Sequence, residues 1–236
     1  MSFFFCINLY TLRVNTLLDG AYAMDDKRTL LLLQRGLEAY EKLKNKELHY
    51  VYLKNGKYRE LVFTPKKEHF LHLCGLNYIN PKTNKPSSAK DFYGIVKKGK
   101  MNLRNINKGQ HSDQKLQIID QLDALLSCNV RVLDTKTTSL NLTFYRGLRT
   151  GKAIFCLALT EADEYKPTGE YVPLSLLDIR RNHFSGPAIP KGEPVHCVYL
   201  VHEKSREVEI ISKNEDFVTY ESRKNYLYEG MVATTD

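Results

Sequence analysis

The sequence predicts an α+β fold in which N-terminal helices and a β-hairpin pack with a bent antiparallel β-sheet. Three observations support this class. Apolar residues recur at helical spacing between residues 25 and 46, an Asn-Gly turn separates two β-rich runs before residue 64, and the apolar period becomes that of strands after Cys128. Helical segments therefore come early and most strands come late, which is typical of α+β proteins.

The first two elements follow directly from these patterns. Residues 25–46 are expected to form a helix, whose apolar face contains Leu30, Leu33, Leu37 and Tyr40. The runs 49–53 and 58–63 flank Lys54-Asn55-Gly56-Lys57. Asn-Gly between β-rich runs favours a two-residue type I′ turn, because both central residues of that turn need a positive φ. The segment is therefore predicted to be a β-hairpin.

Two helices are predicted on either side of a polar loop. Thr64-Pro65 combines an N-cap residue with a proline at the first helical position, so a helix is expected over residues 65–74, with Gly75 as its terminator. Residues 77–87 are rich in Asn, Pro, Lys and Ser and are expected to form a loop. Ser88 then starts a capping-box pattern, with Asp91 at the usual Glu position, which predicts a helix over residues 89–98.

The second half of the chain is expected to be mostly strands. One more helix is predicted from Ser112 to about residue 127, with an apolar face of Leu116, Ile119, Leu122 and Leu126. Strands are expected at 129–133, 140–145 and 153–159, a hairpin at 195–212, and a short edge at 217–220. Residues 171–177 are expected to lead into a short helix or turn. No repeat or long linker divides the chain, so residues 24–236 are predicted to be a single domain.

Residues 1–23 are expected to be an extension outside this core. The segment is apolar and precedes Met24-Asp25-Asp26, where the first helix is expected to begin, so it is interpreted as upstream sequence read through to a natural start at Met24. A packed N-terminal strand is the alternative. A secretory signal is the third interpretation, because Ala21-Tyr22-Ala23 imitates a cleavage site, although the apolar run has no basic start. The segment is too short and too polar for a membrane span.

Positive charge is concentrated in the middle of the chain. Residues 54–108 contain 13 Lys or Arg against three acids, a net charge of +10, while the whole chain has +8. Residues 161–236 are acidic, with nine Lys or Arg against 14 Asp or Glu. A focused basic field usually faces an anion, most commonly phosphate, and a solvated lysine-rich surface is the alternative interpretation.

No motif indicates a cofactor or a metal. The five cysteines form no CxxC pair, which predicts a reducing, cytoplasmic setting without a disulfide framework. His69, His72 and Cys74 could be part of a metal site, but no second group of Cys or His with the spacing of metal ligands occurs in the sequence. The nucleotide-binding patterns Walker A and GxGxxG are also absent. What remains is metal-free chemistry on RNA, which carries its own 2′-hydroxyl nucleophile. Cleavage would then require a base, an acid and cations from the protein.

Two sets of residues resemble a known family. Phe70-x-His72-Leu73-x-Gly75-Leu76, followed by Asp91-Phe92-Tyr93 and by Lys98-Gly99-Lys100, resembles the type-four phage-associated branch of the barnase–EndoU–colicin–RelE-like nuclease superfamily. Tyr171-x-Pro173-x-Ser175-Leu176-Leu177 resembles its later motif. The matching stretches span roughly residues 48–212. The resemblance implies N-terminal helices with a strongly bent antiparallel sheet, and a metal-independent RNase chemistry that is often found in toxins.

The resemblance also implies site residues. His72 would be the general acid or base, and Tyr171 and Ser175 would form a second cluster near the scissile phosphate. Five basic residues are candidates for nucleic-acid contact by charge and position: Lys66, Lys97, Lys98, Lys100 and Arg146. Structural interpretations stay open, because His72 and Tyr171 could simply pack and Ser175 could cap a following helix.

The resulting hypothesis is a metal-independent endoribonuclease, a toxin or mobile-element effector that cleaves by 2′-OH attack. It would use no cofactor, act on tRNA or mRNA in the cytoplasm, have no contact with a membrane, and be restrained by an antitoxin or immunity protein. A non-catalytic nucleic-acid-binding or inhibitor protein of phage or mobile-element origin is the alternative. A protein-binding structural domain is the third hypothesis.

Overall fold

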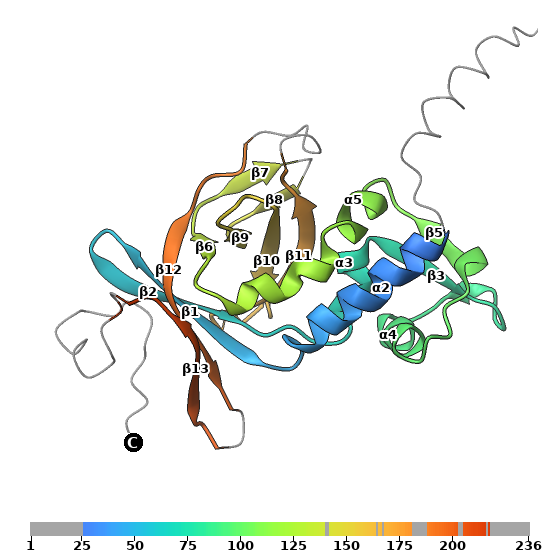
Figure 1. Ribbon diagram of the computed structural model, residues 1–236, viewed down its shortest axis with the longest axis horizontal. Helices are drawn as coiled ribbons and strands as arrows, with labels where there is room; N and C mark the ends of the chain where they lie inside the picture. Colours follow the sequence, from blue (N-terminus) through green and yellow to red (C-terminus); the bar gives the residue numbers. More distant parts are fainter. Residues whose placement is uncertain are drawn as a thin grey trace, which may run out of the picture.

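The computed structural model describes residues 26–139, 142–163, 165–166, 168–180, 188–202, 205–215 and 217. The predicted extension, residues 1–23, lies outside the described residues, as do residues 218–220 of the predicted edge. The helices gather on one side of the molecule and most strands form a barrel on the other (Figure 1). The expected α+β class is therefore confirmed.

The helices of the described residues are short apart from the first. They are α2 (Asp26–Glu41), α3 (His69–Cys74), α4 (Ala89–Lys97), α5 (Ser112–Leu116) and the 3-10 helices η1 (Leu103–Asn105) and η2 (Ile119–Leu126). The predicted cap of α4 is present, because the Ser88 hydroxyl accepts a hydrogen bond of 3.1 Å from the Asp91 backbone N–H. Among the described residues, no helix combines the length and the apolar character that a membrane crossing would need.

The strands fall into one large sheet and two small ones. They are β1 (Glu47–Lys54), β2 (Lys57–Phe63), β3 (Leu76–Asn80), β4 (Lys85–Pro86), β5 (Ile106–Lys108), β6 (Val130–Leu133), β7 (Thr137–Ser139), β8 (Leu142–Phe144), β9 (Arg146–Thr150), β10 (Phe155–Glu161), β11 (Glu170–Asp178), β12 (Glu193–Val201) and β13 (Val208–Lys213). The predicted β1–β2 hairpin is confirmed, with positive φ at both Asn55 and Gly56. The small sheets are β4-β3-β5 and β7-β8.

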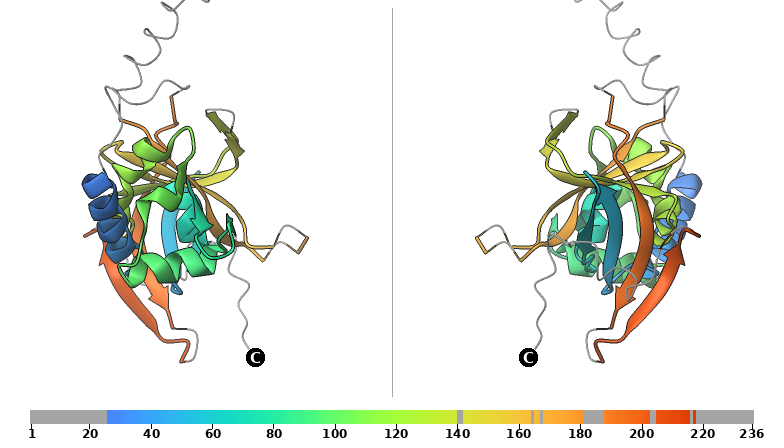
Figure 2. Two further views of the ribbon diagram at one scale, coloured as in Figure 1. Left: turned by 90° about the vertical axis from the view of Figure 1, so that its right-hand side faces the viewer. Right: turned by 90° about the vertical axis from the view of Figure 1, so that its left-hand side faces the viewer.

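The large sheet closes on itself. Its order is β1-β2-β11-β10-β9-β6-β12-β13, and β1 pairs with β12 as well as with β2, so the first seven strands form a barrel. All pairings are antiparallel except the short contact of β11 with β2. Figure 2 shows α2 (blue) at one side of the molecule. The sequence did not predict this closure, because it depends on pairs between strands far apart in the chain.

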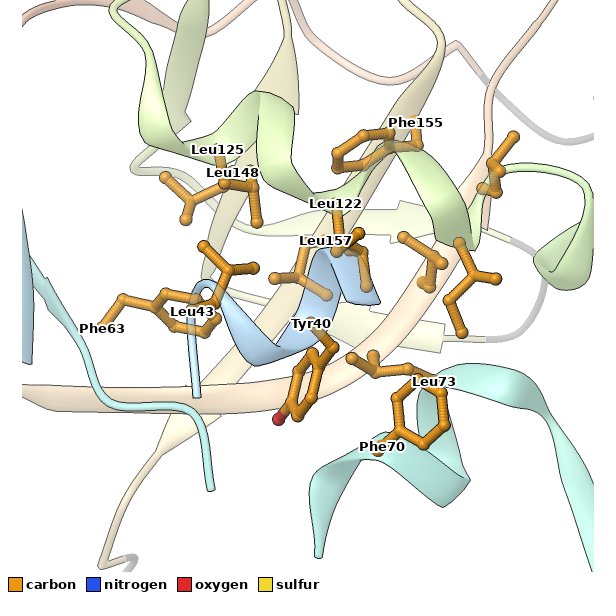
Figure 3. Close-up of a cluster of buried hydrophobic side chains, with 14 of the residues drawn as sticks. Tyr40, Leu43, Phe63, Phe70, Leu73, Leu122, Leu125, Leu148, Phe155 and Leu157 are labelled. Carbon is orange, nitrogen blue, oxygen red and sulfur yellow. The ribbon is translucent and has the colours of Figure 1, made fainter. Parts of the chain in front are cut away.

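The main core lies between the helices and one face of the barrel strands. Its fully buried side chains include Tyr40 of α2, Phe70 of α3, Phe63 of β2 and Phe155 of β10 (Figure 3). Residues that alternate with the core positions along the strands form two smaller clusters on the opposite face. Each fully buried large apolar side chain contributes about 1.5–3 kcal/mol, so this core orders both the helices and the barrel.

The helix predicted from Ser112 to residue 127 is divided in two. An α-helical turn, α5, is followed by the 3-10 helix η2. The buried residues Leu116, Ile119, Leu122 and Leu125 recur every third position. A 3-10 helix has three residues per turn, so it brings this spacing onto one face better than an α-helix does. These positions therefore specify a tighter helix than expected, and the prediction of Leu126 on the apolar face is wrong, because Leu125 is buried there and Leu126 is only partly buried.

The helix predicted over residues 65–74 begins later than expected, at His69. The Pro65 carbonyl accepts a bond of 2.7 Å from the Asn45 N–H, and the Lys66 carbonyl accepts one of 2.7 Å from the Tyr40 hydroxyl. These bonds with distant residues use groups that an earlier first turn would need. The prediction of Gly75 as terminator is confirmed by its φ of 67°.

Two other segments predicted as irregular are strands. The expected loop 77–87 contains most of β3 and all of β4, which form a hairpin. Residues 171–177, expected to lead into a helix or turn, lie within the nine-residue strand β11. Pro173 lies next to a register shift in the β10–β11 pairing, where a missing N–H is tolerated. Ser175 is therefore a strand residue, and the expectation that it caps a short helix is wrong.

Candidate active site

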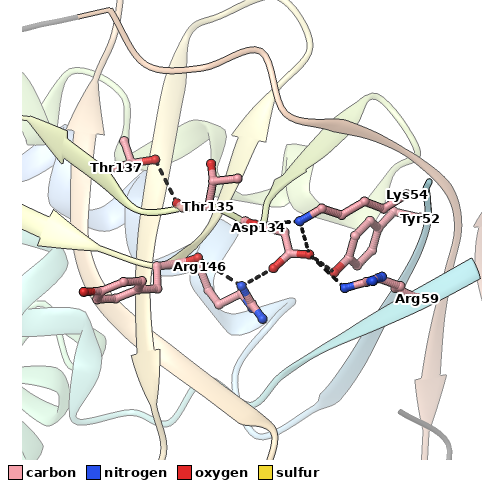
Figure 4. A network of polar contacts seen from close by, with 8 residues as sticks. Tyr52, Lys54, Arg59, Asp134, Thr135, Thr137 and Arg146 are labelled. Atoms are coloured by element: carbon pink, nitrogen blue, oxygen red, sulfur yellow. Dashed lines mark hydrogen bonds and ion pairs between the residues drawn. The ribbon is translucent and has the colours of Figure 1, made fainter. Parts of the chain in front are cut away.

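A buried carboxylate at the barrel gathers three cations. The Asp134 side chain is 4% exposed and lies between Lys54 and Arg59 on one side and Arg146 on the other (Figure 4). The Lys54 Nζ donates to Oδ2 at 2.8 Å and the Tyr52 hydroxyl donates to the same oxygen at 3.1 Å, while an Arg146 nitrogen pairs with Oδ1. The Asp134 carboxylate thus contacts three basic side chains and one hydroxyl group.

The electrostatics of this cluster favour the charged forms. Burial opposes ionisation of Asp134, but the hydrogen bond from Lys54 and the field of Arg146 hold the pKa of its carboxyl below the usual range. Burial also opposes the charge of Arg146, and Asp134 more than compensates by raising the pKa of that guanidinium. Asp134 and Arg146 thus stabilise each other's charged forms.

Arg146 also connects this cluster to Tyr171 of β11. Its guanidinium lies 5.9 Å from the centroid of the Tyr171 ring, within the range of a cation–π contact. Burial raises the pKa of the Tyr171 phenol, and the nearby Glu161 carboxylate raises it further. The Glu161 Oε2 atom is buried and has no hydrogen-bond partner among the described residues. A carboxylate with a free acceptor oxygen thus lies beside a phenol and a guanidinium.

Arg146, Glu161 and Tyr171 line an open cavity of about 520 Å³, called the Tyr171 pocket below. Its lining consists of Thr143, Phe144, Tyr145, Arg146, Leu159, Thr160, Glu161, Tyr171 and Leu174. Tyr145 is 60% exposed and Leu174 is 37% exposed, so apolar and aromatic surface borders the charged groups. A cavity of this size with an aromatic rim and convergent polar groups has the character of a ligand site.

A second cavity of about 250 Å³ lies between α5 and β11 and is called the Lys115 pocket below. The Lys115 Nζ donates to the Ser175 hydroxyl at 3.2 Å and to the His72 carbonyl at 3.4 Å. His111 and Gln114 line the same cavity, with their side chains 3.2 Å apart. Burial lowers the pKa of the Lys115 amine.

The structure brings the sequence-predicted catalytic residues together only in part. His72 and Ser175 share Lys115 as a partner, although His72 uses its backbone carbonyl and its side chain is exposed on α3. Tyr171 lies in the other pocket, where it meets the predicted contact residue Arg146. The roles of His72, Tyr171 and Ser175 remain predictions.

The predicted lysines lie elsewhere on the surface. Lys66, Lys97, Lys98 and Lys100 are all exposed, and none of them lines either pocket. The Lys97 Nζ pairs with Glu41 at 2.9 Å. Their part in nucleic-acid contact therefore remains a prediction based on charge.

Comparison with known families gives one decisive match. The model of the family described as phage-Barnase-EndoU-ColicinE5/D-RelE like nuclease4 matches residues 32–226. The chain belongs to this nuclease family. The match confirms the family that the FxHLxGL and YxPxSLL patterns predicted, and it covers all the elements that line the two pockets. Searches of curated proteins and of solved structures found no match.

Potential metal ligands do not cluster in the described residues of this nuclease-family chain. No group of three or more His, Cys, Asp or Glu among them could hold a metal ion. The cysteines at 74, 128, 156 and 197 are free, and three of them are buried. Several of the described carboxylates are instead bonded to basic residues or histidines, such as Asp134 to Lys54 and Glu47 to His49.

Four residues of the two pockets and the cluster were not predicted as site residues. Glu161 and Asp134 were missed because no recognisable motif surrounds them in the sequence. Lys54 was missed because it was assigned to the turn of the hairpin. Lys115 was missed because it occupies a polar position of a predicted amphipathic helix. Glu161 belongs to an acidic stretch at residues 161–164, and such a stretch is typical of a solvated loop, so the sequence does not single out this carboxylate.

Proposed function

We propose that the protein is a metal-independent endoribonuclease whose reaction takes place in the Tyr171 pocket. The observation that carries the proposal is the grouping of Glu161, Tyr171 and Arg146 around one open cavity, next to the basic side chains that contact Asp134. Membership of a nuclease family supports cleavage of a phosphodiester as the reaction class. RNA as the substrate is inferred from the residue types, since its 2′-hydroxyl needs only a base, an acid and cations.

Glu161, Tyr171 and Arg146 each fit one role in the attack of the 2′-hydroxyl on the phosphate. The Glu161 carboxylate accepts the proton of the 2′-hydroxyl, and the O2′ atom then forms a bond to phosphorus while the bond to O5′ breaks. The products are a 2′,3′-cyclic phosphate and a 5′-hydroxyl, which receives a proton from the Tyr171 phenol. The raised pKa of Tyr171 keeps that proton on the phenol at neutral pH. Arg146 stabilises the negative charge that develops on the phosphorane oxygens.

The surroundings of the pocket support an RNA ligand. Asp134 fixes the direction of Arg146, so the guanidinium needs little reorganisation when a phosphate arrives. The exposed Tyr145 ring offers a surface on which an unpaired base can stack. Single-stranded RNA is therefore the proposed form of the substrate. We further propose that the protein acts in the cytoplasm as a toxin or mobile-element effector, held in check by an antitoxin or immunity protein.

The test compares matched variants on labelled single-stranded RNA in the presence of EDTA. Glu161→Gln preserves the side-chain volume and removes the charge, and it is expected to lower the cleavage rate about 10²–10⁴-fold, the usual contribution of a general base. Glu38→Gln on the exposed face of α2 is the matched control and is expected to cleave like the wild type. His72→Ala, assayed beside them, tests the role that the family resemblance implies for that residue.

The products and the binding data decide between enzyme and binder. Discrete cuts with 2′,3′-cyclic ends, lost in Glu161→Gln, support the proposal. Cutting that needs added magnesium, or a fully active Glu161→Gln variant, contradicts it. A folded protein that shifts RNA on a gel without cutting it would instead favour a non-catalytic nucleic-acid-binding or inhibitor protein of phage origin.

A further inference from the structure

The Lys115 pocket contains a half-buried lysine whose amine is bonded to uncharged groups. Among the described residues, no carboxylate lies within ion-pairing distance of the Lys115 Nζ, whose hydrogen-bond partners are the Ser175 hydroxyl and the His72 carbonyl. Asp178 lines the same pocket, but its carboxylate is bound by Arg180 at 2.5–3.2 Å. A half-buried cation beside a cavity, with neutral partners only, has the electrostatic character of an anion site.

The lysine is held in place by the end of α3. Gly75 ends that helix with a φ of 67°, and a Cβ at this position would come within 2.9 Å of the Lys115 Cδ. The absence of a side chain at Gly75 therefore allows the Lys115 stem to cross the helix terminus. Its amine then reaches the terminal His72 carbonyl, at the helix end that favours a cation. Lys115 is thus fixed by packing, in contrast to a surface lysine that samples many directions.

The two pockets are neighbours along the same two strands. β8 contributes Leu142 to the Lys115 pocket and Thr143 to the Tyr171 pocket. β11 contributes Ser175 to the first and Tyr171 to the second. The two residues are four positions apart, which corresponds to at most about 13 Å, because the pairing of β11 with β10 shifts register between them. One extended ligand that follows β8 and β11 can therefore reach both cavities.

We infer that the Lys115 pocket binds a second phosphate group of the RNA strand, at a site distinct from the phosphate that is cleaved in the Tyr171 pocket. The inference rests on the proposed function, and it adds a minimum length to the substrate. Lys115 supplies the charge, while the Ser175 hydroxyl and the polar groups of His111 and Gln114 supply hydrogen bonds. An incoming phosphate also favours the charged form of Lys115, whose pKa burial lowers.

The length of the oligonucleotide distinguishes a ligand that occupies both pockets from one that occupies a single pocket. A dinucleotide has one bridging phosphate and cannot place a phosphate in both pockets. A hexanucleotide covers at least about 17 Å, even at the stacked spacing of about 3.4 Å per nucleotide, and can do so. Lys115 should therefore contribute to the binding of a hexanucleotide and not to that of a dinucleotide.

The experiment measures the binding of fluorescent 2′-O-methyl oligonucleotides, which lack the nucleophilic hydroxyl and cannot be cleaved by the proposed route. Lys115→Met is expected to weaken hexanucleotide binding about tenfold and to lower the salt slope of log K by about 0.7, the value for one phosphate contact on a single strand. Lys115→Arg should retain most of the affinity. Lys108→Met is the matched control, because the Lys108 Nζ already pairs with Asp113 at 2.7 Å.

Equal hexanucleotide affinity and salt slope in Lys115→Met and Lys108→Met would overturn the inference, as would an equal loss for the dinucleotide. If Lys115→Met does not fold, Ser175→Ala tests the same pocket, and an unchanged hexanucleotide affinity would then overturn it. Cleavage of the unmethylated hexanucleotide is measured in parallel. Binding that depends on Lys115 without any cleavage would leave the phosphate site in place and refute only the proposed enzymatic function.

Discussion

Replacing Asp134 with alanine tests whether one buried carboxylate organises the cations of the site. The Asp134 side chain is 4% exposed and accepts hydrogen bonds from Lys54 at 2.8 Å and from Tyr52 at 3.1 Å. Arg146 pairs with its other oxygen. Asp134→Ala removes the shared anion and leaves the basic side chains facing each other, so the variant is expected to be less stable than the wild type.

The magnitude follows from the burial of the partners. Removing one member of a buried ion pair typically costs about 3–5 kcal/mol. The Lys54 and Arg146 side chains retain 21% and 32% exposure, so water can solvate them in part. We therefore expect a loss near the lower limit, about 3 kcal/mol, which corresponds to a decrease in Tm of about 6–12 °C for a protein of this size.

The pH dependence gives an independent check. Because the pKa of Asp134 is lowered in the folded state, its stabilising contribution is complete above the unfolded value of about 4 and is lost as the pH falls through the folded value. The stability difference between the wild type and Asp134→Ala should therefore shrink below about pH 4.

Urea unfolding followed by circular dichroism measures these differences at several pH values. Asp113→Ala is the matched control, because Asp113 pairs with Lys108 at 2.7 Å at a site where both side chains are about one-third exposed. Such a pair contributes less than about 1 kcal/mol. Equal destabilisation by the two variants at pH 7, or an Asp134→Ala effect that persists unchanged at pH 3, would refute the reasoning.

Three further predictions concern the fold. Burial opposes the charge of His49, yet its hydrogen bond to Glu60 raises its pKa in the folded protein, so the stabilisation by charged His49 is complete below about pH 6.5 and is lost as the pH rises through the folded value. In urea titrations, His49→Gln should therefore lower the free energy of unfolding more at pH 6 than at pH 8.5. An equal loss at both pH values would contradict this. Ser88→Ala removes the oxygen that accepts from the Asp91 N–H and should cost about 1 kcal/mol by thermal unfolding, whereas a neutral result would show that the cap is not stabilising. Leu157→Ala empties a fully buried core position and should cost about 2–5 kcal/mol, and a loss below 1 kcal/mol would mean that the core is less closely packed than described.

Local features of the chain could be predicted because short-range chemistry specifies them. Asn55-Gly56 favours positive φ in any context, and both residues adopt it in the β1–β2 turn. Gly75 and Ser88 likewise end and begin helices through groups that lie within a few residues. The family could be predicted for a related reason, since the FxHLxGL and YxPxSLL patterns are contiguous in the sequence.

The candidate site could be predicted only in part. Tyr171 and Arg146 were both named as candidates, and the structure places them in contact. Tyr171 was predicted from the YxPxSLL pattern and Arg146 from its charge and position, so their contact was not foreseen. Asp134, Glu161 and Lys115 have no distinctive sequence neighbours. Each becomes notable only through partners that are far away in the chain, such as Lys54, which is 80 residues from Asp134.

The sequence by itself determined the α+β class, the hairpin, the Ser88 cap, the Gly75 terminator and the nuclease family, because these depend on neighbouring residues and contiguous motifs. The prediction of Thr64 as an N-cap was wrong, because α3 begins only at His69. The tertiary structure alone decided the closed barrel, the length of α3 and the two pockets. Closure requires β1 to pair with β12 across about 150 positions of the chain, and such pairs are set by the packing of the whole core. The burial of a charge follows from the same packing, which is why Asp134 and Lys115 acquire their roles only in the folded protein.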